Sequence, residues 1–418
     1  MSTTNQPLQT LKGFRDFLPL EKQQRDFVLN KVKQTFELYG FEPLETPTLE
    51  YADLLLGKYG QEADQLVYTF QDRGQRQIGL RYDQTVPTAR ILAQYQHQLP
   101  RYFRRYQIQN VFRADKPQKG RFREFTQCDI DIFGATAPIA DAEILACTYA
   151  AFQNVGFNQV ELSINDRQIL FKTLKPIATQ EVDVFSIIQS IDKLDKISEE
   201  QVLAELTNKG LDHQVAEQAL TAIQQAQISV NLQDIIDQAV NLGVPQDKIK
   251  FNSTLARGLD YYTGMIFEVI LPNYQVGSCG GGGRYDNLIA ELGGLKMPAV
   301  GIAFGFDRMV EAAAKLGIFK QLTNTTQVLV TLFAPETRAV SLQTAQKLRQ
   351  AGIKTEVYPE FDKLSKQFKL ADQKKLAWVI VIGEKELAAQ TVSLKNMASG
   401  EQTELSLEKA IKQLKKTN

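Results

Sequence analysis

The first third of the chain alternates between one helical pattern and several strand patterns. In residues 21–39 apolar side chains recur every three or four positions, which predicts an amphipathic helix that ends at Gly40. We expect a strand through Pro47 to follow. Between Gln77 and Phe133 the segments QIGLRY, RYQIQNVFR and EFTQCDIDIF alternate or cluster β-branched and aromatic residues, with the polar segment DKPQKGR between two of them. This pattern predicts an antiparallel sheet with one exposed loop.

The pattern changes after residue 174. Residues 175–249 are rich in Leu, Ile, Ala, Gln and acidic side chains at helical spacing, which predicts an inserted helical domain. Strands are predicted to return in NSTLARGLDYYTGMIFEVIL, followed by a turn at GSCGGGGRYD and by a strand that runs into a helix at GIAFGFDRMVEAAAKLG. We therefore expect residues 1–174 and 250–322 to form one core.

The remainder of the chain has the pattern of a separate domain. The polar segment KQLTNTTQ after Phe319 has the composition of a linker. Residues 327–418 then alternate strand and helix patterns, from QVLVTLF through AWVIVIG to a final helix. This alternation is typical of a small α/β domain with a mainly parallel sheet.

Composition excludes several classes of protein. Hydrophobic residues make up 43% and charged residues 23% of the chain, so disorder is not its main state. No stretch approaches the roughly 18 consecutive apolar residues of a membrane helix, and the N-terminal segment lacks a basic stretch followed by an apolar run, so we expect a cytoplasmic protein. Three cysteines without CxxC spacing are expected to be buried thiols. Only two histidines are present, so we predict neither a protein-bound metal nor a Ser-His-Asp triad.

Charge is balanced over the whole chain but not along it. Lys+Arg and Asp+Glu both number 48. Between Arg101 and Thr126, however, eight basic residues accompany two acidic ones, with aromatic residues interleaved, which is typical of an anion-binding stretch. Residues 181–245 carry a net charge of −8 and residues 327–418 one of +5. These differences agree with a division into three domains.

Two arginine-containing segments carry candidate chemistry. In VFRADKPQKGRFREF, arginines on adjacent strands can donate bidentate hydrogen bonds to several phosphates, and a phenylalanine can give a flat face for a base; a solvated charged hairpin is the alternative. In TLARGLDYYTG, Arg257 lies on a predicted apolar strand, where its guanidinium must meet an anionic ligand or a carboxylate such as Asp260. The residues of the first segment are Arg113, Asp115, Lys119, Arg121 and Arg123, with Phe112, Phe122 and Phe125.

Glycines and isolated polar residues mark further candidates. Gly280–Gly283 allow a close approach to a ligand, or form a simple turn, but match neither a P-loop nor GxGxxG. In GIAFGFDRM, Arg308 at a helix N-terminus would face a flat ligand, or else pair with Asp307. Buried carboxylates need partners, which a protonated amine or an imidazole would supply. The polar residues on elements otherwise built for burial are Asp83, Thr85, Gln127 and Asp131.

In this order the segments resemble the class II aminoacyl-tRNA synthetases, and among them the histidyl-tRNA synthetase family. YGFEPLETPTLEY is similar to motif 1 of the class, NVFRADKPQKGRFREFTQCDIDIFG to motif 2 and GIAFGFDRM to motif 3. LKGFRDFLP, LARGLDYYTG and GGGRYDNL resemble segments of the histidine enzymes. The resemblance covers essentially the whole chain. It implies an α+β fold, in which helices flank an antiparallel sheet, with a helical insertion and a C-terminal α/β anticodon-binding domain.

The resemblance also implies an activity and a role for each candidate residue. The activity is activation of histidine with ATP to histidyl-adenylate, with Mg²⁺ on the phosphates, and transfer to the 3′-terminal ribose of tRNA(His). Arg257 and Arg113 would be catalytic, and the helix over residues 21–39, as part of motif 1, implies a homodimer. ATP would be bound by Arg113, Asp115, Arg121 and Arg308. Histidine would be bound by Asp83, Gln84, Thr85, Arg113, Gln127, Asp131, Arg257, Tyr261, Tyr262 and Tyr285.

The chain departs from the commonest bacterial form of the family at three carboxylates. Asp83, Asp131 and Asp307 stand where many members have Glu, so the charge is kept but each side chain is one methylene shorter.

Two alternatives share the fold without the activity. One is the non-catalytic relative that regulates the first enzyme of histidine biosynthesis and generally lacks the anticodon-binding domain. Residues 327–418 and the three arginines of the motifs argue against it. The other is a nucleic-acid-binding module without catalysis. Histidine-dependent exchange of pyrophosphate into ATP separates the synthetase from both.

Overall fold

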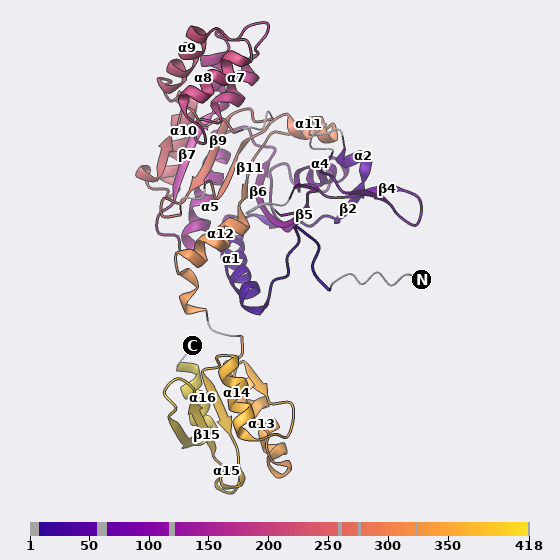
Figure 1. The fold of residues 1–418 in the computed structure, drawn as a ribbon, viewed down its shortest axis with the longest axis vertical. Coiled ribbons are helices and arrows are strands. Elements are labelled where there is room, and N and C mark those ends of the chain that lie inside the picture. Colours follow the sequence, from indigo (N-terminus) through magenta and orange to yellow (C-terminus); the bar gives the residue numbers. More distant parts are fainter. Residues whose placement is uncertain are drawn as a thin grey trace. The chain divides into compact units, whose positions relative to one another are not determined.

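The chain forms two compact units, Met1–Phe319 and Lys320–Asn418 (Figure 1). The computed structural model describes residues 8–56, 65–116, 122–257, 261–274, 277–322 and 325–416. Within these ranges, no helix combines the length and the apolar character needed to cross a bilayer. The three cysteines are buried free thiols, as the sequence predicted.

The first unit is built around a sheet of eight strands. The six central strands run antiparallel to their neighbours, and one further strand joins each edge in parallel. This sheet, flanked by helices, confirms the predicted α+β fold. In sheet order the strands are β1 (Glu42–Pro43), β5 (Phe103–Phe112), β6 (Glu124–Phe133), β11 (Ala299–Phe304), β10 (Gly280–Arg284), β9 (Met265–Ile270), β7 (Glu161–Asp166) and β8 (Ile249–Phe251).

A second, smaller sheet takes part of the segment that was expected to belong to the large one. Its antiparallel strands are β2 (Leu49–Tyr51), β4 (Gln77–Leu80) and β3 (Thr69–Gln71), in the order β2-β4-β3. The strand predicted through Pro47 is wrong, because β1 ends before it and β2 begins after it. Two short helices that the sequence did not predict, α2 (Ala52–Leu55) and α4 (Thr85–Gln94), accompany this sheet.

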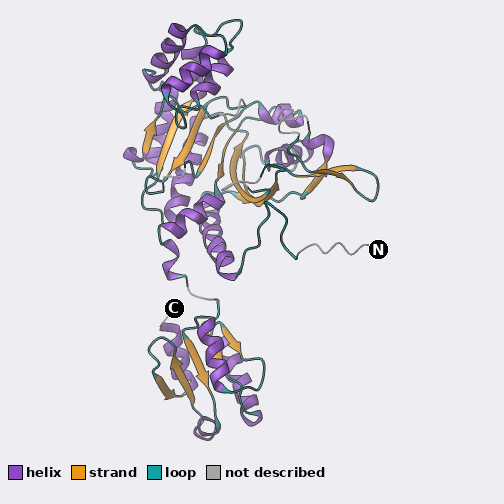
Figure 2. Cartoon of the chain, in the orientation of Figure 1, coloured by secondary structure: helices purple, strands orange, loops and turns teal. Residues whose placement is uncertain are grey.

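Helices cover one face of the large sheet. Helix α1 (Pro19–Leu38) packs against α5 (Pro138–Val155) and α12 (Phe306–Lys315), and α5 packs against β6 and β11; Figure 2 shows these helices against the strands. Helix α1 is followed by Gly40 at φ +74°, as the sequence predicted, but it begins at a proline two residues before the predicted start. Three further helical segments are α6 (Arg167–Leu174), α11 (Leu288–Gly293) and η2 (Ile318–Gln321), and η1 (Gln246–Lys248) lies at the end of the insertion.

The opposite face of the sheet is polar. Along β6, Cys128, Ile130 and Ile132 are fully or nearly buried. Because side chains alternate along a strand, the polar residues between them project from the other face. That face carries the candidate site.

The glycine-rich segment is a strand and not the turn that the sequence predicted. Gly280–Arg284 form β10, which pairs with β9 on one side and β11 on the other. A Cβ atom on Gly282 would lie 1.9 Å from the carbonyl oxygen of Gly301. The strand predicted through TLARGLDYYTG is also wrong at its described positions, since Arg257 has φ +50° and β9 begins only at Met265.

The predicted helical insertion contains four α-helices, each with a polar N-cap. The side chains of Asp183, Ser198, Asp212 and Ser229 accept hydrogen bonds from backbone N–H groups in the first turns. Three of the helices pack on one another and on α6, whereas the last packs against α5. They are α7 (Val184–Ile191), α8 (Glu199–Asn208), α9 (His213–Gln224) and α10 (Val230–Asn241).

The second unit is a five-stranded sheet with helices. Its first three strands are parallel, as the sequence predicted, and an antiparallel hairpin that was not predicted extends the sheet. In sheet order the strands are β13 (Thr355–Val357), β12 (Val328–Val330), β14 (Trp378–Val381), β15 (Val392–Asn396) and β16 (Gln402–Leu405). The helical segments are η3 (Pro335–Thr337), α13 (Arg338–Gln350), α14 (Leu364–Gln373), α15 (Glu384–Ala389) and α16 (Leu407–Lys416).

Candidate active site

Two cavities lie side by side on the polar face of the large sheet. The first, of about 610 Å³, extends from β6 and the residues that follow β5 to the start of α12. The second, of about 680 Å³, extends from α4 to β10 and β11. Both volumes suit small-molecule ligands. Six residues line both cavities and therefore mark their junction: Tyr82, Arg113, Gln127, Arg257, Gly281 and Ala303.

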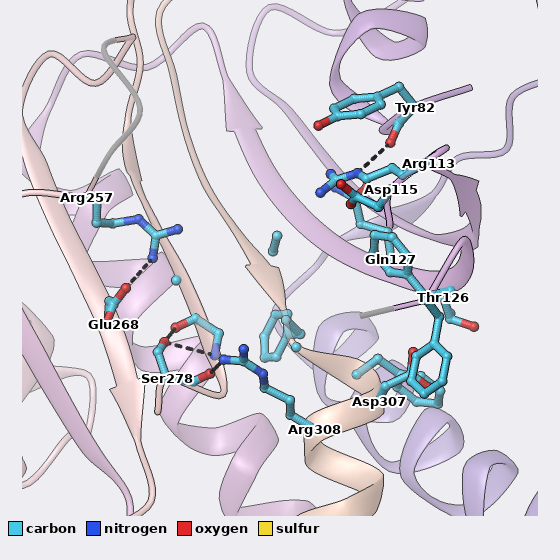
Figure 3. Close-up of a pocket in the computed structure, with 18 of the residues that line it drawn as sticks. Tyr82, Arg113, Asp115, Thr126, Gln127, Arg257, Glu268, Ser278, Asp307 and Arg308 are labelled. Atoms are coloured by element: carbon cyan, nitrogen blue, oxygen red, sulfur yellow. Dashed lines mark hydrogen bonds and ion pairs between the residues drawn. The ribbon is translucent and has the colours of Figure 1, made fainter. Parts of the chain in front are cut away.

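Arginines line opposite sides of the first cavity. Figure 3 shows Arg257 and Arg308 on one side, with Arg113 and Asp115 on the other. Arg308 donates a 2.6 Å hydrogen bond to the carbonyl oxygen of Ser278. The alternative pairing of Arg308 with Asp307 is not seen, since Asp307 pairs with arginines of the N-terminal segment.

Arg113 is held between two aromatic rings. Its Cζ atom lies 4.3 Å from the ring centroid of Tyr82 and 5.1 Å from that of Phe125, and its Nε donates to the Tyr82 carbonyl oxygen at 3.2 Å. A guanidinium fixed in this way presents its two terminal nitrogens in a defined plane, which suits bidentate recognition of phosphate or carboxylate.

Arg257 reaches the junction from a loop in a left-handed conformation. Its Nη1 lies 3.3 Å from both Glu268 Oε1 and the Phe267 carbonyl oxygen. Its Nε is buried and has no hydrogen-bond partner among the described residues. The carboxylate that pairs with Arg257 is therefore that of Glu268, while Asp260 lies outside the described residues. A buried guanidinium with an unused donor at a cavity junction is suited to an anionic ligand.

The second cavity has an acidic wall made by two neighbouring strands. In the register of β5 and β6, Arg105 is opposite Asp131. Arg105 Nη2 lies 2.7 Å from Asp131 Oδ2, and the hydroxyl of Tyr285 donates to the same carboxylate. Gln127 Nε2 donates to Asp129 Oδ2 at 2.7 Å, while Asp129 Oδ1 is buried without a hydrogen-bond partner in the described part of the chain.

Burial dominates the electrostatics of this wall. It raises the pKa of Asp129 well above its ordinary value and raises that of Asp131, although Arg105 opposes both shifts. The charge of Asp83 raises the pKa of Asp129 further. Three carboxylates and one arginine line this part of the cavity, which favours a cationic ligand. Because Arg113 and Arg257 lie at the junction, the second cavity is acidic at one end and basic at the other, which matches the charge distribution of an amino acid.

Aromatic rings and a helix N-terminus complete the second cavity. The ring centroid of Tyr261 lies 4.6 Å from that of Tyr262 and 5.9 Å from that of Tyr285. The Asp83 carboxylate accepts from the backbone N–H groups of Thr85 and Val86, at 3.1 and 3.2 Å, where α4 begins. These bonds fix the carboxylate at the cavity wall.

The structure brings together most of the residues that the sequence singled out. Gln84, however, lines neither cavity in the described part of the chain, since it is fully buried and its amide donates to the carbonyl oxygens of Gln109 and Gln127. Arg121 and Lys119 lie outside the described residues. The predicted residues that line a cavity are Asp83, Thr85, Arg113, Asp115, Gln127, Asp131, Arg257, Tyr261, Tyr262, Tyr285 and Arg308.

Several cavity residues were missed, among them Arg105, Asp129 and Glu268. A signal for two of them exists in the sequence, because polar residues at alternate positions of RYQIQ and QCDID must share one face of their strands. Glu268 carries no such signal, since it lies alone in the apolar strand MIFEVI.

The antiparallel sheet carries arginines beside one cavity and an acidic wall beside the second. This arrangement is that of the catalytic core of a class II aminoacyl-tRNA synthetase. Residues 13–309 match the family model described as histidyl-tRNA synthetase, and residues 327–417 match the anticodon binding domain model. The chain belongs to the histidyl-tRNA synthetase family.

Individual relatives agree over almost the full length. The chain is 37% identical to the histidine–tRNA ligase of Cytophaga hutchinsonii, over 96% of this chain and 98% of the relative. The crystal structure of histidyl-tRNA synthetase from Nostoc sp. PCC 7120 is similar with a TM-score of 0.87 and 32% identity, over 98% and 99% of the two chains. A Bacillus halodurans structure described as an ATP phosphoribosyltransferase regulatory subunit/histidyl-tRNA synthetase shares the fold, with a TM-score of 0.74 and 22% identity, over 90% and 98% of the two chains.

Proposed function

We propose that the chain is a histidine–tRNA ligase, which forms histidyl-adenylate from histidine and ATP and transfers the histidyl group to the 3′-terminal ribose of tRNA(His). The observation that carries the proposal is the junction of the two cavities at Arg113 and Arg257. An amino acid in one cavity and a nucleotide in the other would place the carboxylate and the α-phosphate between these two arginines. Family membership over nearly the whole chain supports the same activity.

Histidine would bind in the second cavity. Its ammonium group and its imidazole would face the acidic wall of Asp83 and Asp131, with Gln127 and Thr85 as further polar partners. Tyr261 and Tyr262 would pack against the imidazole ring, and Tyr285 would hold Asp131 in place through its hydroxyl. The carboxylate would then point toward the arginines at the junction.

ATP would bind in the first cavity. Arg113 and Arg308 would hold phosphates from opposite sides. Asp115 and Phe125 also line this cavity, and the Phe125 ring would give a flat surface for the base. One histidine carboxylate oxygen attacks the α-phosphorus, the bond from that phosphorus to the β-bridging oxygen breaks, and pyrophosphate leaves. Arg257 and Arg113 would stabilise the negative charge that develops on the α-phosphoryl oxygens. No side-chain nucleophile is required.

Magnesium would enter with the phosphates of ATP. Its preferred ligands are oxygen atoms, and the phosphates would supply most of them. The carboxylates of Glu268, Asp115 and Asp307 line the first cavity, but the described residues contain no group of three His, Cys, Asp or Glu side chains placed to hold a metal ion. Asp307 is held by two arginines and Glu268 by Arg257, so these side chains are oriented before any ligand arrives. The ion would supply charge neutralisation on the leaving pyrophosphate.

The remaining parts of the proposal concern the whole assembly. We infer a catalytic core of residues 1–174 and 250–322, a helical insertion over 175–249 and an anticodon-binding domain over 327–418. The net charge of +5 of the last domain suits contact with tRNA phosphates. A homodimer through the α1 region and a cytoplasmic location complete the proposal.

The decisive experiment is exchange of labelled pyrophosphate into ATP by the purified full-length chain. Exchange that requires histidine and is not supported by other amino acids is the expected result, followed by charging of tRNA(His). A chain that shows no exchange but alters the activity of an ATP phosphoribosyltransferase would be the regulatory relative instead.

A further inference from the structure

The segment LKGFRDFLP near the N-terminus resembles the family but has no role in the mechanism above. In the structure it runs beside the motif 2 strands. The backbone N–H of Arg123 donates to the Gly13 carbonyl oxygen at 2.8 Å, and its Nη1 donates to the Lys12 carbonyl oxygen at 3.4 Å. Residues 10–17, here called the N-terminal strap, are therefore attached directly at the start of β6.

Arg15 in the strap contacts two residues that line the first cavity. Its Cζ atom lies 3.4 Å from the centroid of the Phe122 ring, which is close stacking of a guanidinium on an aromatic face. Its Nη2 lies 3.1 Å from Asp307 Oδ1. Phe122 and Asp307 are both cavity residues, one at the end of the motif 2 loop and the other in the first turn of α12.

A second arginine holds the same carboxylate from α1. Arg25 pairs with Asp307, and its Nη2 donates to the hydroxyl of Thr126 at 3.0 Å. Its Cζ atom lies 4.1 Å from the ring centroid of Phe17 and 4.8 Å from that of Phe306. With Asp307 already paired to Arg25, the ion pair alone does not explain a second arginine.

The burial of Arg15 also argues for a specific role. Its side chain is 26% exposed, and its Nε is buried without a hydrogen-bond partner among the described residues. A guanidinium that lies flat on a ring with its Nε buried loses hydration. The stacking contact must offset the free-energy cost of that loss. The geometry favours the aromatic contact as the reason for the arginine.

We propose that Arg15 is a positioning residue for ATP, which fixes the ring of Phe122 by covering one of its faces, so that the ring forms a rigid wall for the nucleoside part of ATP. This inference rests on the proposed function for the identity of the nucleotide. Arg15 acts through Phe122 and does not itself line the cavity. The role predicts an effect on ATP and none on histidine.

The test compares Arg15→Met, which keeps the length of the side chain but removes the charge and the planar head, with wild type. The KM for ATP in pyrophosphate exchange should rise about tenfold, with the KM for histidine within about twofold, as expected for loss of one stacked cation. Arg15→Lys keeps the ion pair with Asp307 but loses planar stacking, so it should restore only part of the affinity for ATP. Lys12→Met is the matched control, because Lys12 contacts Arg123 through its backbone carbonyl, and it should leave both KM values unchanged.

A double-mutant cycle with Phe122→Leu tests the path of the effect. If Arg15 acts through Phe122, the KM for ATP of the double variant should equal that of Phe122→Leu alone. Additive effects, or equal rises in both KM values, would overturn the proposal. Calorimetric titration of ATP into Arg15→Met and wild type separates this inference from the proposed function, because weaker ATP binding supports the role of Arg15 even in a chain that shows no exchange. Unchanged ATP affinity in Arg15→Lys and Arg15→Met would refute it.

Discussion

The guanidinium of Arg257 occupies the space that a side chain on Gly281 would need. A Cβ atom at position 281 would lie 1.4 Å from Arg257 Nη1 and 2.6 Å from its Cζ. Gly281 lies in the extended strand β10 and is not among the residues with positive φ, so the backbone does not require glycine there. The glycine is needed for clearance, and this clearance lets Arg257 reach the junction of the two cavities.

Gly281→Ala should abolish adenylate formation while leaving the fold intact. The new methyl group displaces the tip of a flexible side chain, so the rate of pyrophosphate exchange should fall about 10²–10³-fold, as for loss of one transition-state donor. Gly282→Ala is the matched control, because there the methyl group meets the backbone of Gly301 and should lower the melting temperature. Thermal melting and exchange measured on both variants check the prediction, and normal exchange by Gly281→Ala would contradict it.

Arg257→Ala should leave the melting temperature close to that of wild type and reduce exchange about 10²–10³-fold. The reason is that a positive charge is lost where the transition state gains negative charge. Arg257→Lys should recover only part of the rate, because an ammonium group cannot match both the Glu268 contact and a planar phosphate contact. Exchange by the alanine variant at a near wild-type rate would remove Arg257 from the mechanism.

Tyr285→Phe should weaken histidine and spare ATP. The variant removes the hydroxyl that donates to Asp131, so a buried carboxylate oxygen loses a partner, at a cost of about 1–3 kcal/mol. We expect the KM for histidine to rise roughly tenfold, in line with that energy, with the KM for ATP unchanged. Steady-state exchange at varied histidine and ATP checks this, and equal changes in both KM values would indicate a general loss of structure.

The sequence predicted those features that depend on local periodicity and failed where tertiary packing decides. Helix α1 and the passage from β11 into α12 follow apolar spacing and end signals, so both were found. Gly280–Gly283 have poor strand propensity, and only the neighbouring backbones make them a central strand. Arg257 pairs with Glu268, which follows it in sequence by eleven positions, and no local pattern indicates that contact.

The candidate site shows the same division. Asp131 and Gln127 could be picked out as polar residues in a buried strand, but Gln84 could not be distinguished from a ligand-binding residue, since its role as a donor to two backbone carbonyls depends on strands β5 and β6 lying beneath it. Residues brought in by the resemblance were largely those that line the cavities. Their partners, such as Arg105, became evident only with the register of the sheet.

Asp129→Asn should stabilise the protein at neutral pH. Burial raises the pKa of Asp129 well above its ordinary value of 3.8, so the folded chain holds this proton more tightly than the unfolded chain. The contribution of this bound proton to the free energy of unfolding is fully present below about pH 3.8 and is lost as the pH rises through the raised pKa. An asparagine at this position does not titrate, so the variant does not lose this stability as the pH rises. Its melting temperature should therefore exceed that of wild type at pH 7, and the difference should shrink as the pH falls toward 4.

The same variant should bind histidine less well, because one carboxylate of the acidic wall is gone. Melting curves between pH 5 and pH 8 and the KM for histidine at pH 7 check both effects. Glu291→Gln is a useful comparison, since Glu291 also lines the second cavity but is exposed, and this variant should not gain in melting temperature at pH 7. A lower melting temperature of Asp129→Asn at pH 7 would show that its charge stabilises the fold.

Removal of the second unit should separate adenylation from tRNA charging. Every described residue assigned to the two cavities lies in the first unit, which is compact on its own, so a chain that ends within KQLTNTTQ should still catalyse histidine-dependent exchange. Charging of tRNA should weaken strongly, since the removed domain carries a net charge of +5. The dependence of the KM for tRNA on salt should also become shallower, because each lost phosphate contact reduces the slope.

Mixing in the separately expressed second unit should not restore charging, because anticodon contact helps only when it is covalently linked to the core. A folded truncated chain with an unchanged KM for tRNA would refute the assignment of residues 327–418 to anticodon binding.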